Sequence, residues 1–461
     1  MTELASLSSK RSILRGIPIP YLVFGMLFVL ALGLRVALYP LLTGDYTFFV
    51  SQWYDFIQSH GGFAAMKYNF SNYNPPYLYL LAVATYLPIP KLVAIKSISV
   101  VFDVVLALFT YLILRLKYEH SYIPIIGAIV MLFAPTVVIN SSAWGQCDAI
   151  YAAFCLGSLY FLLKKRPAWA CVFFGVAIAF KLQAIFFLPV LLMFVLKRTL
   201  PLRYLILIPA VFLALLVPSY LAGRDVGSLL TVYTEQMNTG GVGAGVTQTP
   251  NGQARPMNGN GMPQFDNRNG QPSANAGSPP VRPQNGFGGT PGGRPGAGFG
   301  QFSFTSLTYN APTIYQWLDG TAFANNKWVG IGLAALAIAL LGGLLLVTKT
   351  SLTSRVIMDI SLVCALTIPF LLPEMHERYF YLADVISIVY AFSFPRSFYV
   401  AIIMQLISLL SYAPYLLNIE IMSLWYVSFA VLGLVLVAWV RLVYSSRREL
   451  SIQSQALRTE S

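Results

Sequence analysis

The carboxylates most able to do chemistry lie in an aromatic, glycine-containing stretch that follows the first long apolar run. Residues 42–76 read LTGDYTFFVSQWYDFIQSHGGFAAMKYNFSNYNPP and contain Asp45 and Asp55, in a chain with only 17 Asp and Glu against 30 Lys and Arg. Gly44 allows a sharp backbone turn, which would leave the Asp45 carboxylate just beyond a helix end. A carboxylate placed there can act as a general base on a hydroxyl group. A loop acid without a catalytic role is the alternative.

A second polar group, NSSAWGQCD at residues 140–148, has the composition of a sugar-binding site. An indole ring packs on the C–H faces of a sugar, while amide and carboxylate groups bind its hydroxyls. If residues 144–148 open the next helix, Trp144 and Asp148 are four residues apart and share a face. A helix cap with an interfacial tryptophan explains the pattern equally well. The candidates for sugar binding are Trp144, Gln146 and Asp148.

Cationic residues supply the opposite charge. Lys181 interrupts an apolar segment, where it needs an anionic partner such as a phosphate or must extend to the membrane surface. Residues 373–379, PEMHERY, lie between two apolar runs and could hold a phosphate leaving group as its bond breaks. The substrate-binding candidates on this side are Lys181, Gln183, His376, Glu377, Arg378 and Tyr379.

The sequence predicts neither a metal site nor a cofactor. The chain has three histidines, and none belongs to an HExxH pattern. Its four cysteines, Cys147, Cys155, Cys171 and Cys364, lie in or beside apolar segments without CxxC spacing, so we expect them to be small core residues.

Two further charges lie within predicted spans. We expect Asp103 to form a structural hydrogen bond with a neighbouring helix. Arg35, late in the first span, is expected to extend outward to the membrane surface.

The composition shows which elements must position these groups. With 57% hydrophobic and 10% charged residues, the chain is predicted to be an all-α polytopic membrane protein rather than a soluble domain. The net charge of +13 comes from short clusters between apolar runs, without a basic stripe interleaved with aromatics, so no nucleic-acid partner is expected. A span needs about 20 apolar residues, which predicts about 11–13 transmembrane helices. The candidate spans are residues 19–42, 92–116, 123–140, 148–164, 204–222, 327–347, 355–372, 379–394, 398–416 and 421–442, with a hairpin of two short helices over 167–197 and Lys181 near its tip.

The basic clusters predict the orientation of the chain. They make residues 1–18 a cytoplasmic N-terminus and residues 443–461 a cytoplasmic tail. Residues 19–222 form an N-terminal catalytic module with outer loop 43–75, and residues 327–442 form the C-terminal helices. The other outer segments are 141–148, 223–326 and 373–378. This assignment is consistent only if residues 76–90 do not cross the membrane fully.

The long outer segment 223–326 contains a low-complexity region. Residues 236–311 are rich in Gly, Asn, Pro and Gln, which predicts disorder. Its flanks, residues 227–237 and 305–318, are aromatic and amphipathic, and we expect short helices at the membrane interface.

Taken together, the motifs resemble those of the GT-C glycosyltransferases, and most closely the bacterial relatives of the GPI and dolichol-pathway mannosyltransferases. The early acid, the Tyr-x-Pro-Pro stretch at residues 73–76, INSSAWGQCDAIYAAF, GVAIAFKLQAIFFLPVLL and LLPEMHERYFY occur in the same order. The resemblance covers roughly residues 20–395. It differs in two respects: Asp45 stands alone instead of in an adjacent acidic pair, and the low-complexity region falls where some relatives have an ordered outer loop.

The resemblance implies an inverting enzyme with its site on the extracytoplasmic side of a bacterial plasma membrane, and with polyprenyl-phosphate sugars as donors. Asp45 would activate the acceptor hydroxyl, with Asp55 held in reserve. Lys181, His376 and Arg378 would contact the lipid phosphate, and Trp144, Gln146 and Asp148 would line the sugar site. The expected reaction moves a hexose, mannose or glucose, to a glycan, lipid or protein acceptor among the membrane lipids.

Two other functions fit parts of the sequence. A transporter or a flippase for lipid-linked saccharides needs the same apolar helices, but it predicts paired repeats and charges at the bilayer midplane. Here the polar motifs fall at span ends on one side, which favours an enzyme. A polymer-anchoring protein would explain residues 236–311 but not the polar cluster.

Overall fold

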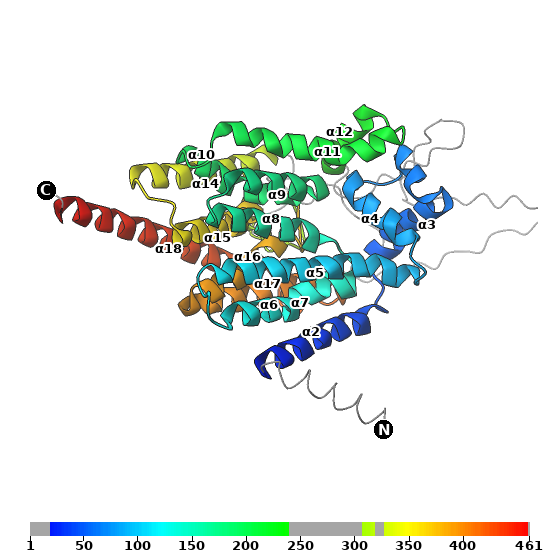
Figure 1. Cartoon of the computed structure of the whole chain (residues 1–461), viewed down its shortest axis with the longest axis horizontal. Coiled ribbons are helices and arrows are strands. Elements are labelled where there is room, and N and C mark those ends of the chain that lie inside the picture. The colour runs from blue at the N-terminus through cyan, green and yellow to red at the C-terminus, as the bar shows by residue number, and fades with distance from the viewer. Residues whose placement is uncertain (1–18, 239–306, 319–326, 460–461) are drawn as a thin grey trace, which may run out of the picture.

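The computed structural model describes residues 19–238, 307–318 and 327–459, which form a bundle of helices (Figure 1). Its first part contains α2 (Ile19–Leu38), α3 (Ser51–Ser59), α4 (Pro75–Thr85), α5 (Lys91–Arg115), α6 (Ile123–Phe133), α7 (Pro135–Val138), α8 (Asp148–Leu163), α9 (Pro167–Phe180), α10 (Leu188–Leu196), α11 (Leu207–Leu221) and α12 (Val226–Asn238). Its second part contains β1 (Thr308–Tyr309), α14 (Lys327–Val347), α15 (Ser354–Leu371), β2 (Met375–His376), α16 (Tyr381–Ser393), α17 (Phe398–Leu416) and α18 (Leu424–Thr459). Two π-helical segments, Tyr46–Val50 and Ile139–Trp144, and the 3₁₀ turns Gly62–Lys67, Leu182–Phe187, Leu202–Ile206, Ile314–Gln316 and Pro395–Ser397 complete the described chain.

The predicted class, a polytopic helical membrane protein, is confirmed. In the described residues, seven helices are long and apolar enough to cross a membrane, or eight if the pair Ile123–Phe133 and Pro135–Trp144, bent by 49°, counts as one span. Four shorter apolar helices, Asp148–Leu163, Pro167–Phe180, Leu182–Leu196 and Tyr381–Ser393, fall within the predicted spans. The described helices reach the expected range of 11–13 spans only if these shorter helices cross as well.

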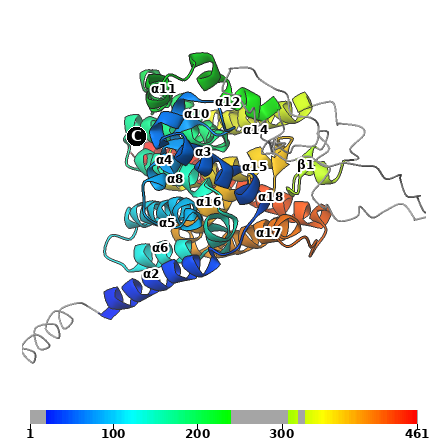
Figure 2. The ribbon, with the colours of Figure 1, turned by 90° about the vertical axis from the view of Figure 1, so that its right-hand side faces the viewer.

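The helix bundle has two ends that differ in the elements they contain. Figure 1 shows α3 and α4 at one end and the C-terminal end of α18 at the other, and Figure 2 views the end with α3 and α4. In the interior, α8 packs on α5 and α9, α15 packs on α18, and α16 packs on α17. The side chains of α15 and α16 are almost all buried, while α2 and α11 expose many apolar side chains, as helices that face lipid do.

Helix α4 bears on the topology. It has 11 residues, with a proline at each of its first two positions, and at 1.5 Å per residue it is about 16 Å long. A helix of that length cannot span a hydrocarbon core of about 30 Å. This length agrees with the requirement that residues 76–90 do not cross the membrane fully, which stays a prediction.

The segment around Lys181 folds as a helical hairpin. Helix α9 ends at Phe180, Lys181 is extended with φ −154° and ψ 133°, and a 3₁₀ turn leads into α10. The backbone amide of Lys181 still donates to the Ala177 carbonyl, so the break comes directly after α9.

The flanks of the low-complexity region differ from each other. The helix expected over 227–237 is observed as α12, and its Tyr233 hydroxyl donates to the Ile178 carbonyl at 2.6 Å. The helix expected over 305–318 is wrong for the described part of that segment. There β1 pairs in parallel with β2, and a 3₁₀ turn follows, because the backbone of the PEMHERY loop offers it hydrogen bonds. The disorder prediction for 236–311 falls almost entirely outside the described residues.

Arg35 and Asp103 form a buried ion pair that joins α2 to α5. The Arg35 Nε atom is 2.8 Å from Asp103 Oδ2, and both side chains are fully buried. Ser141 also donates to this carboxylate, at 2.6 Å. The structural hydrogen bond expected of Asp103 is confirmed. The expectation that Arg35 extends to the surface is wrong, because the carboxylate on the neighbouring helix binds it inside the bundle.

We expect Arg35→Met to lower the free energy of unfolding by about 3–5 kcal/mol, since it leaves the Asp103 carboxylate buried without its cation. The double variant Arg35→Met/Asp103→Leu should recover much of this loss. Thermal unfolding of the detergent-purified proteins measures both. A single variant within about 0.5 kcal/mol of wild type would contradict the assignment.

Candidate functional site

The predicted acid Asp45 lies directly before the π-helical segment Tyr46–Val50, in the stretch of chain that connects this segment to the end of α2 at Leu38. Its backbone is helical, with φ −58° and ψ −41°, and Gly44 does not have a positive φ. The Asp45 amide donates to the Tyr415 hydroxyl at 3.2 Å, and the Asp45 side chain is 23% exposed. Tyr415, far away in the sequence, therefore fixes the backbone of Asp45, while the side chain stays partly exposed.

One oxygen of Asp45 carries all of its recorded polar contacts. Oδ2 accepts a hydrogen bond from Trp144 Nε1 at 2.9 Å and another from Gln146 Nε2. The same oxygen lies 3.6 Å from Arg378 Nη1. Among the described residues, Oδ1 has no hydrogen-bond partner. The Asp45 carboxylate therefore has one fixed oxygen and one that is free to accept a proton.

The segment at 140–148 does not fold as the sequence suggested. Trp144 ends the π-helical segment Ile139–Trp144, Gly145 is left-handed with φ 80°, and α8 begins only at Asp148. The prediction that Trp144 and Asp148 share one helix face is therefore wrong, because the glycine breaks the helix between them. The left-handed turn instead aims Gln146 and Trp144 at Asp45.

Trp144 is fully buried, so its ring has no face open to a sugar. It stacks on Tyr415 with ring centroids 4.8 Å apart and planes at 16°. The indole Nε1, the one polar atom of the side chain, donates a hydrogen bond to Asp45. This geometry makes Trp144 a support for the acid.

Arg378 lies between the carboxylates of the site. Its guanidinium is 3.6 Å from Asp45, 3.8 Å from Asp148 and 3.2 Å from Glu377, and 5.7 Å from the centre of the Trp144 ring. Only the contact with Glu377 meets hydrogen-bond geometry, and the buried Nε atom has no hydrogen-bond partner among the described residues. Arg378 therefore holds unused donor capacity inside an acidic cluster.

Lys181 is already paired. Its Nζ atom binds Asp148 Oδ1, with both side chains almost fully buried, and Asn140 Nδ2 donates to Asp148 Oδ2 at 2.8 Å. The alternative that Lys181 extends to the membrane surface does not hold, since the lysine is only 4% exposed. Gln183, on the 3₁₀ turn that follows, is buried, and its Oε1 lacks a partner among the described residues.

The PEMHERY loop is held by the short sheet. His376 lies in β2 opposite Tyr309 of β1, and the two rings stack with centroids 4.7 Å apart. His376 Nδ1 is 3.9 Å from Glu377 Oε2, and the His376 and Tyr379 rings are 5.1 Å apart. Burial raises the pKa of the Glu377 carboxyl to about 7, and the neighbouring Arg378 guanidinium limits the rise.

Asp55 is not part of this cluster. Its carboxylate is 58% exposed and binds Lys91 Nζ, 2.9 Å from each oxygen. The structure brings together Asp45, Trp144, Gln146, Asp148, Lys181, Glu377 and Arg378, and it leaves Asp55 on α3 outside.

A small cavity opens beside the acid. It has a volume of about 40 Å³ and is lined by Asp45, Phe49, Val50, Trp53, Asn72, Tyr73, Gln146 and Arg378. This is room for about one water molecule, so a hydroxyl group fits there and a whole sugar does not without movement of the aromatic loop.

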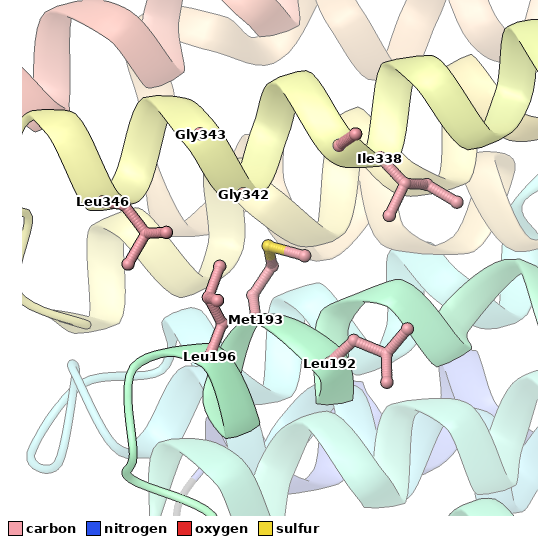
Figure 3. Close-up of a pocket in the computed structure, with 8 residues that line it drawn as sticks. Leu192, Met193, Leu196, Ile338, Gly342, Gly343 and Leu346 are labelled. Carbon is pink, nitrogen blue, oxygen red and sulfur yellow. The ribbon is translucent and has the colours of Figure 1, made fainter.

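A larger cavity of about 320 Å³ lies between α10 and α14. Figure 3 shows its lining of Leu192, Met193, Leu196, Ile338 and Leu346 around Gly342 and Gly343. No polar side chain lines it, so it offers no group for catalysis. Within the described residues, no group of three or more His, Cys, Asp or Glu could hold a metal ion.

The sequence analysis missed two residues. Tyr415 binds the backbone amide of Asp45, and Lys96 binds backbone carbonyls of the segments that precede Asp45 and Trp144. Tyr415 carries no local signal, because it meets Asp45 only through the packing of α17. Lys96 could have been found, since a lysine inside an apolar span is expensive and therefore functional or structural by default.

Comparison with known proteins bears on the same residues. Residues 70–257 match glycosyltransferase family 87, and no curated protein matches the chain. The matched range contains Trp144, Gln146, Asp148 and Lys181, while Asp45 and Arg378 reach the same cluster from outside it. The match of residues 70–257 to glycosyltransferase family 87, a family of the GT-C type, indicates that the chain is a membrane glycosyltransferase.

Proposed function

We propose that the protein transfers a hexose, mannose or glucose, from a polyprenyl-phosphate carrier to an extracytoplasmic acceptor with inversion at the anomeric carbon. The observation that carries the proposal is the pairing of two unused groups in one cluster. Asp45, whose Oδ1 has no hydrogen-bond partner among the described residues, and Arg378, whose buried Nε has none either, line the same small cavity. A base and a cation side by side suit a displacement at C1 of a sugar phosphate.

The reaction is a single displacement. The acceptor hydroxyl oxygen attacks C1, its proton passes to Asp45 Oδ1, and the bond between C1 and the phosphate oxygen breaks. The electron pair of that bond leaves with the lipid phosphate. Trp144 and Gln146 hold Oδ2, so the other oxygen stays directed at the acceptor.

Arg378 is the group best suited to the developing charge on the phosphate. A guanidinium can donate two parallel hydrogen bonds to phosphate oxygens. Lys181 contributes positive potential while paired with Asp148. His376 lies in the same loop and is the third candidate for phosphate contact, with Gln183 and Tyr379 as candidate sugar or carrier contacts.

The site would face the extracytoplasmic side. The cluster lies where α8 begins and where the Lys181 hairpin turns, whereas the basic segments at 164–166 and 197–203 follow the opposite ends of α8 and α10. Basic residues concentrate on the cytoplasmic side of membrane proteins, which supports this orientation.

The proposal is tested with purified protein in liposomes and a panel of radiolabelled donors. We expect transfer from a polyprenyl-phosphate hexose and none from the corresponding nucleotide sugar. Transfer from the nucleotide sugar alone would refute the donor class. Movement of the labelled lipid across the bilayer without a glycosylated product would favour a flippase.

Glu377 predicts the alkaline side of the pH profile. Its carboxyl loses a proton as the pH rises through about 7, which places a negative charge beside Arg378 and opposes the donor phosphate. We expect kcat/KM for the donor to fall above about pH 7, and Glu377→Gln to remove this fall. Glu374→Gln, in the same loop but paired with Lys327, is the matched control and should keep the wild-type profile. An unchanged alkaline limb in Glu377→Gln would contradict the assignment.

A further inference from the structure

Lys96 is a fully buried lysine on α5 that the proposed reaction does not use. Among the described residues it has no recorded ion pair with an acid. Its Nζ atom donates instead to the backbone carbonyls of Tyr39 at 3.0 Å, Leu41 at 2.5 Å, Ser142 at 2.8 Å and Ala143 at 3.0 Å. An ammonium has three hydrogens, so four acceptors use its whole donor capacity.

These carbonyls belong to two helix ends. Tyr39 and Leu41 follow the last residue of α2, and Ser142 and Ala143 lie in the final turn of the π-helical segment Ile139–Trp144. Carbonyls at a helix C-terminus lack intrahelical partners, and each such end acts as roughly half a negative charge. Because Tyr39 and Leu41 lie just beyond α2, the four carbonyl dipoles act on the ammonium together with the partial negative charge of the two nearby helix ends. The buried ammonium is therefore compensated without a carboxylate.

The chain that follows these two helix ends contains the residues that hydrogen-bond to each other at the site: Asp45 after the first end, and Trp144 and Gln146 at the second. The chain runs from Leu41 to Asp45 on one side, and from Ala143 to Trp144 and Gln146 on the other. Thr43 Oγ1 links these two segments of the chain by donating a hydrogen bond to the Trp144 carbonyl at 2.9 Å.

The Lys96 stem also contacts the turn that aims Gln146. A Cβ atom on the left-handed Gly145 would lie 3.5 Å from Lys96 Cε, so this turn packs against the lysine methylenes. Lys96 thus contacts both backbone segments that position Asp45. It also contacts Gly145, which lies between Trp144 and Gln146, the two hydrogen-bond donors to Asp45.

We propose that Lys96 is a positioning residue that holds the end of α2 against the Ile139–Trp144 segment, so that Asp45 Oδ2 lies between Trp144 and Gln146 while Oδ1 faces the acceptor. The inference rests on the proposed role of Asp45 as the base. Lys96 touches neither substrate in this account and acts through the position of Asp45 alone.

The test is Lys96→Met in the liposome assay with a polyprenyl-phosphate hexose. We expect kcat to fall by about 10²-fold, as for a displaced catalytic group, while KM for the donor stays near wild type. Lys117→Met is the matched control, because it removes a lysine that binds a single carbonyl, that of Ser393, just beyond the opposite end of α5. It should retain wild-type kcat.

A double-mutant cycle separates the inference from the proposed function. If Lys96 acts through Asp45, Lys96→Met should slow the Asp45→Asn enzyme far less than it slows wild type. An equal factor in both backgrounds would overturn the positioning role. Wild-type kcat in Asp45→Asn alone would instead refute the proposed base.

A second variant and readout cover the case in which Lys96→Met does not fold. Lys96→Gln keeps an amide donor but is shorter and uncharged, so it should lower kcat by a smaller factor. Hydrogen exchange of residues 39–47 and 139–146 should become faster in this variant, with exchange in α16 unchanged. Wild-type exchange in both segments together with wild-type kcat would overturn the inference.

Discussion

Asp45→Asn is expected to lower kcat by about 10²–10⁴-fold, the range for loss of a general base, with little change in KM for the donor. Asparagine has nearly the same shape, and its carbonyl oxygen can still accept from Trp144 and Gln146. The variant therefore removes the proton acceptor while keeping the local hydrogen bonds. Initial rates with a radiolabelled polyprenyl-phosphate hexose measure the effect.

Asp55→Asn is the matched control for this variant. Asp55 lies nearby in the sequence, on α3, but its carboxylate is exposed and binds Lys91 outside the cluster. We expect its kcat to remain within about twofold of wild type, since exposed ion pairs contribute little. A large loss in Asp55→Asn with an active Asp45→Asn would exchange the roles of the two acids.

Arg378→Lys is expected to lower kcat by about 10²–10³-fold, the range for removal of one donor that stabilises transition-state charge. The lysine retains the positive charge, so the three neighbouring carboxyls keep a counter-ion. It lacks the planar fork and the Nε donor, which has no hydrogen-bond partner among the described residues in the wild-type protein. The loss should therefore appear in kcat, with the folded yield close to wild type.

Arg355→Lys provides the comparison for this change. Arg355 lies over the Phe394 ring, 4.7 Å from its centre, away from the carboxylate cluster. It should keep wild-type kcat. Near-wild-type kcat in Arg378→Lys would show that the guanidinium geometry does not take part in the displacement.

The sequence predicted the parts of the site whose local signals are strong. Asp45 and Arg378 are charges at the borders of apolar runs, where polar groups are costly, and the structure brings them within 3.6 Å. The helical class followed from the length and composition of the same runs. Lys181 was also identified, but its partner Asp148 was assigned to a sugar, because sequence spacing does not show which charges meet across the bundle.

The remaining features depend on geometry that the sequence does not encode locally. Trp144 looked like a sugar platform, yet its ring is covered by Tyr415, which lies far away in the sequence. The left-handed Gly145 broke a helix that residue spacing alone extended through it. The β1–β2 pairing replaced an expected helix because two short segments satisfy each other's backbone groups. Arg35 turned inward because Asp103 was available on α5.

The most direct test of the account is a structure of the protein bound to a polyprenyl-phosphate hexose analogue in which carbon replaces the oxygen between C1 and phosphorus. We expect its phosphonate oxygens within hydrogen-bond distance of Arg378 and its C1 facing the cavity beside Asp45 Oδ1. A phosphonate that contacts neither Arg378 nor Lys181, or a sugar at the opposite membrane face, would contradict the proposed site.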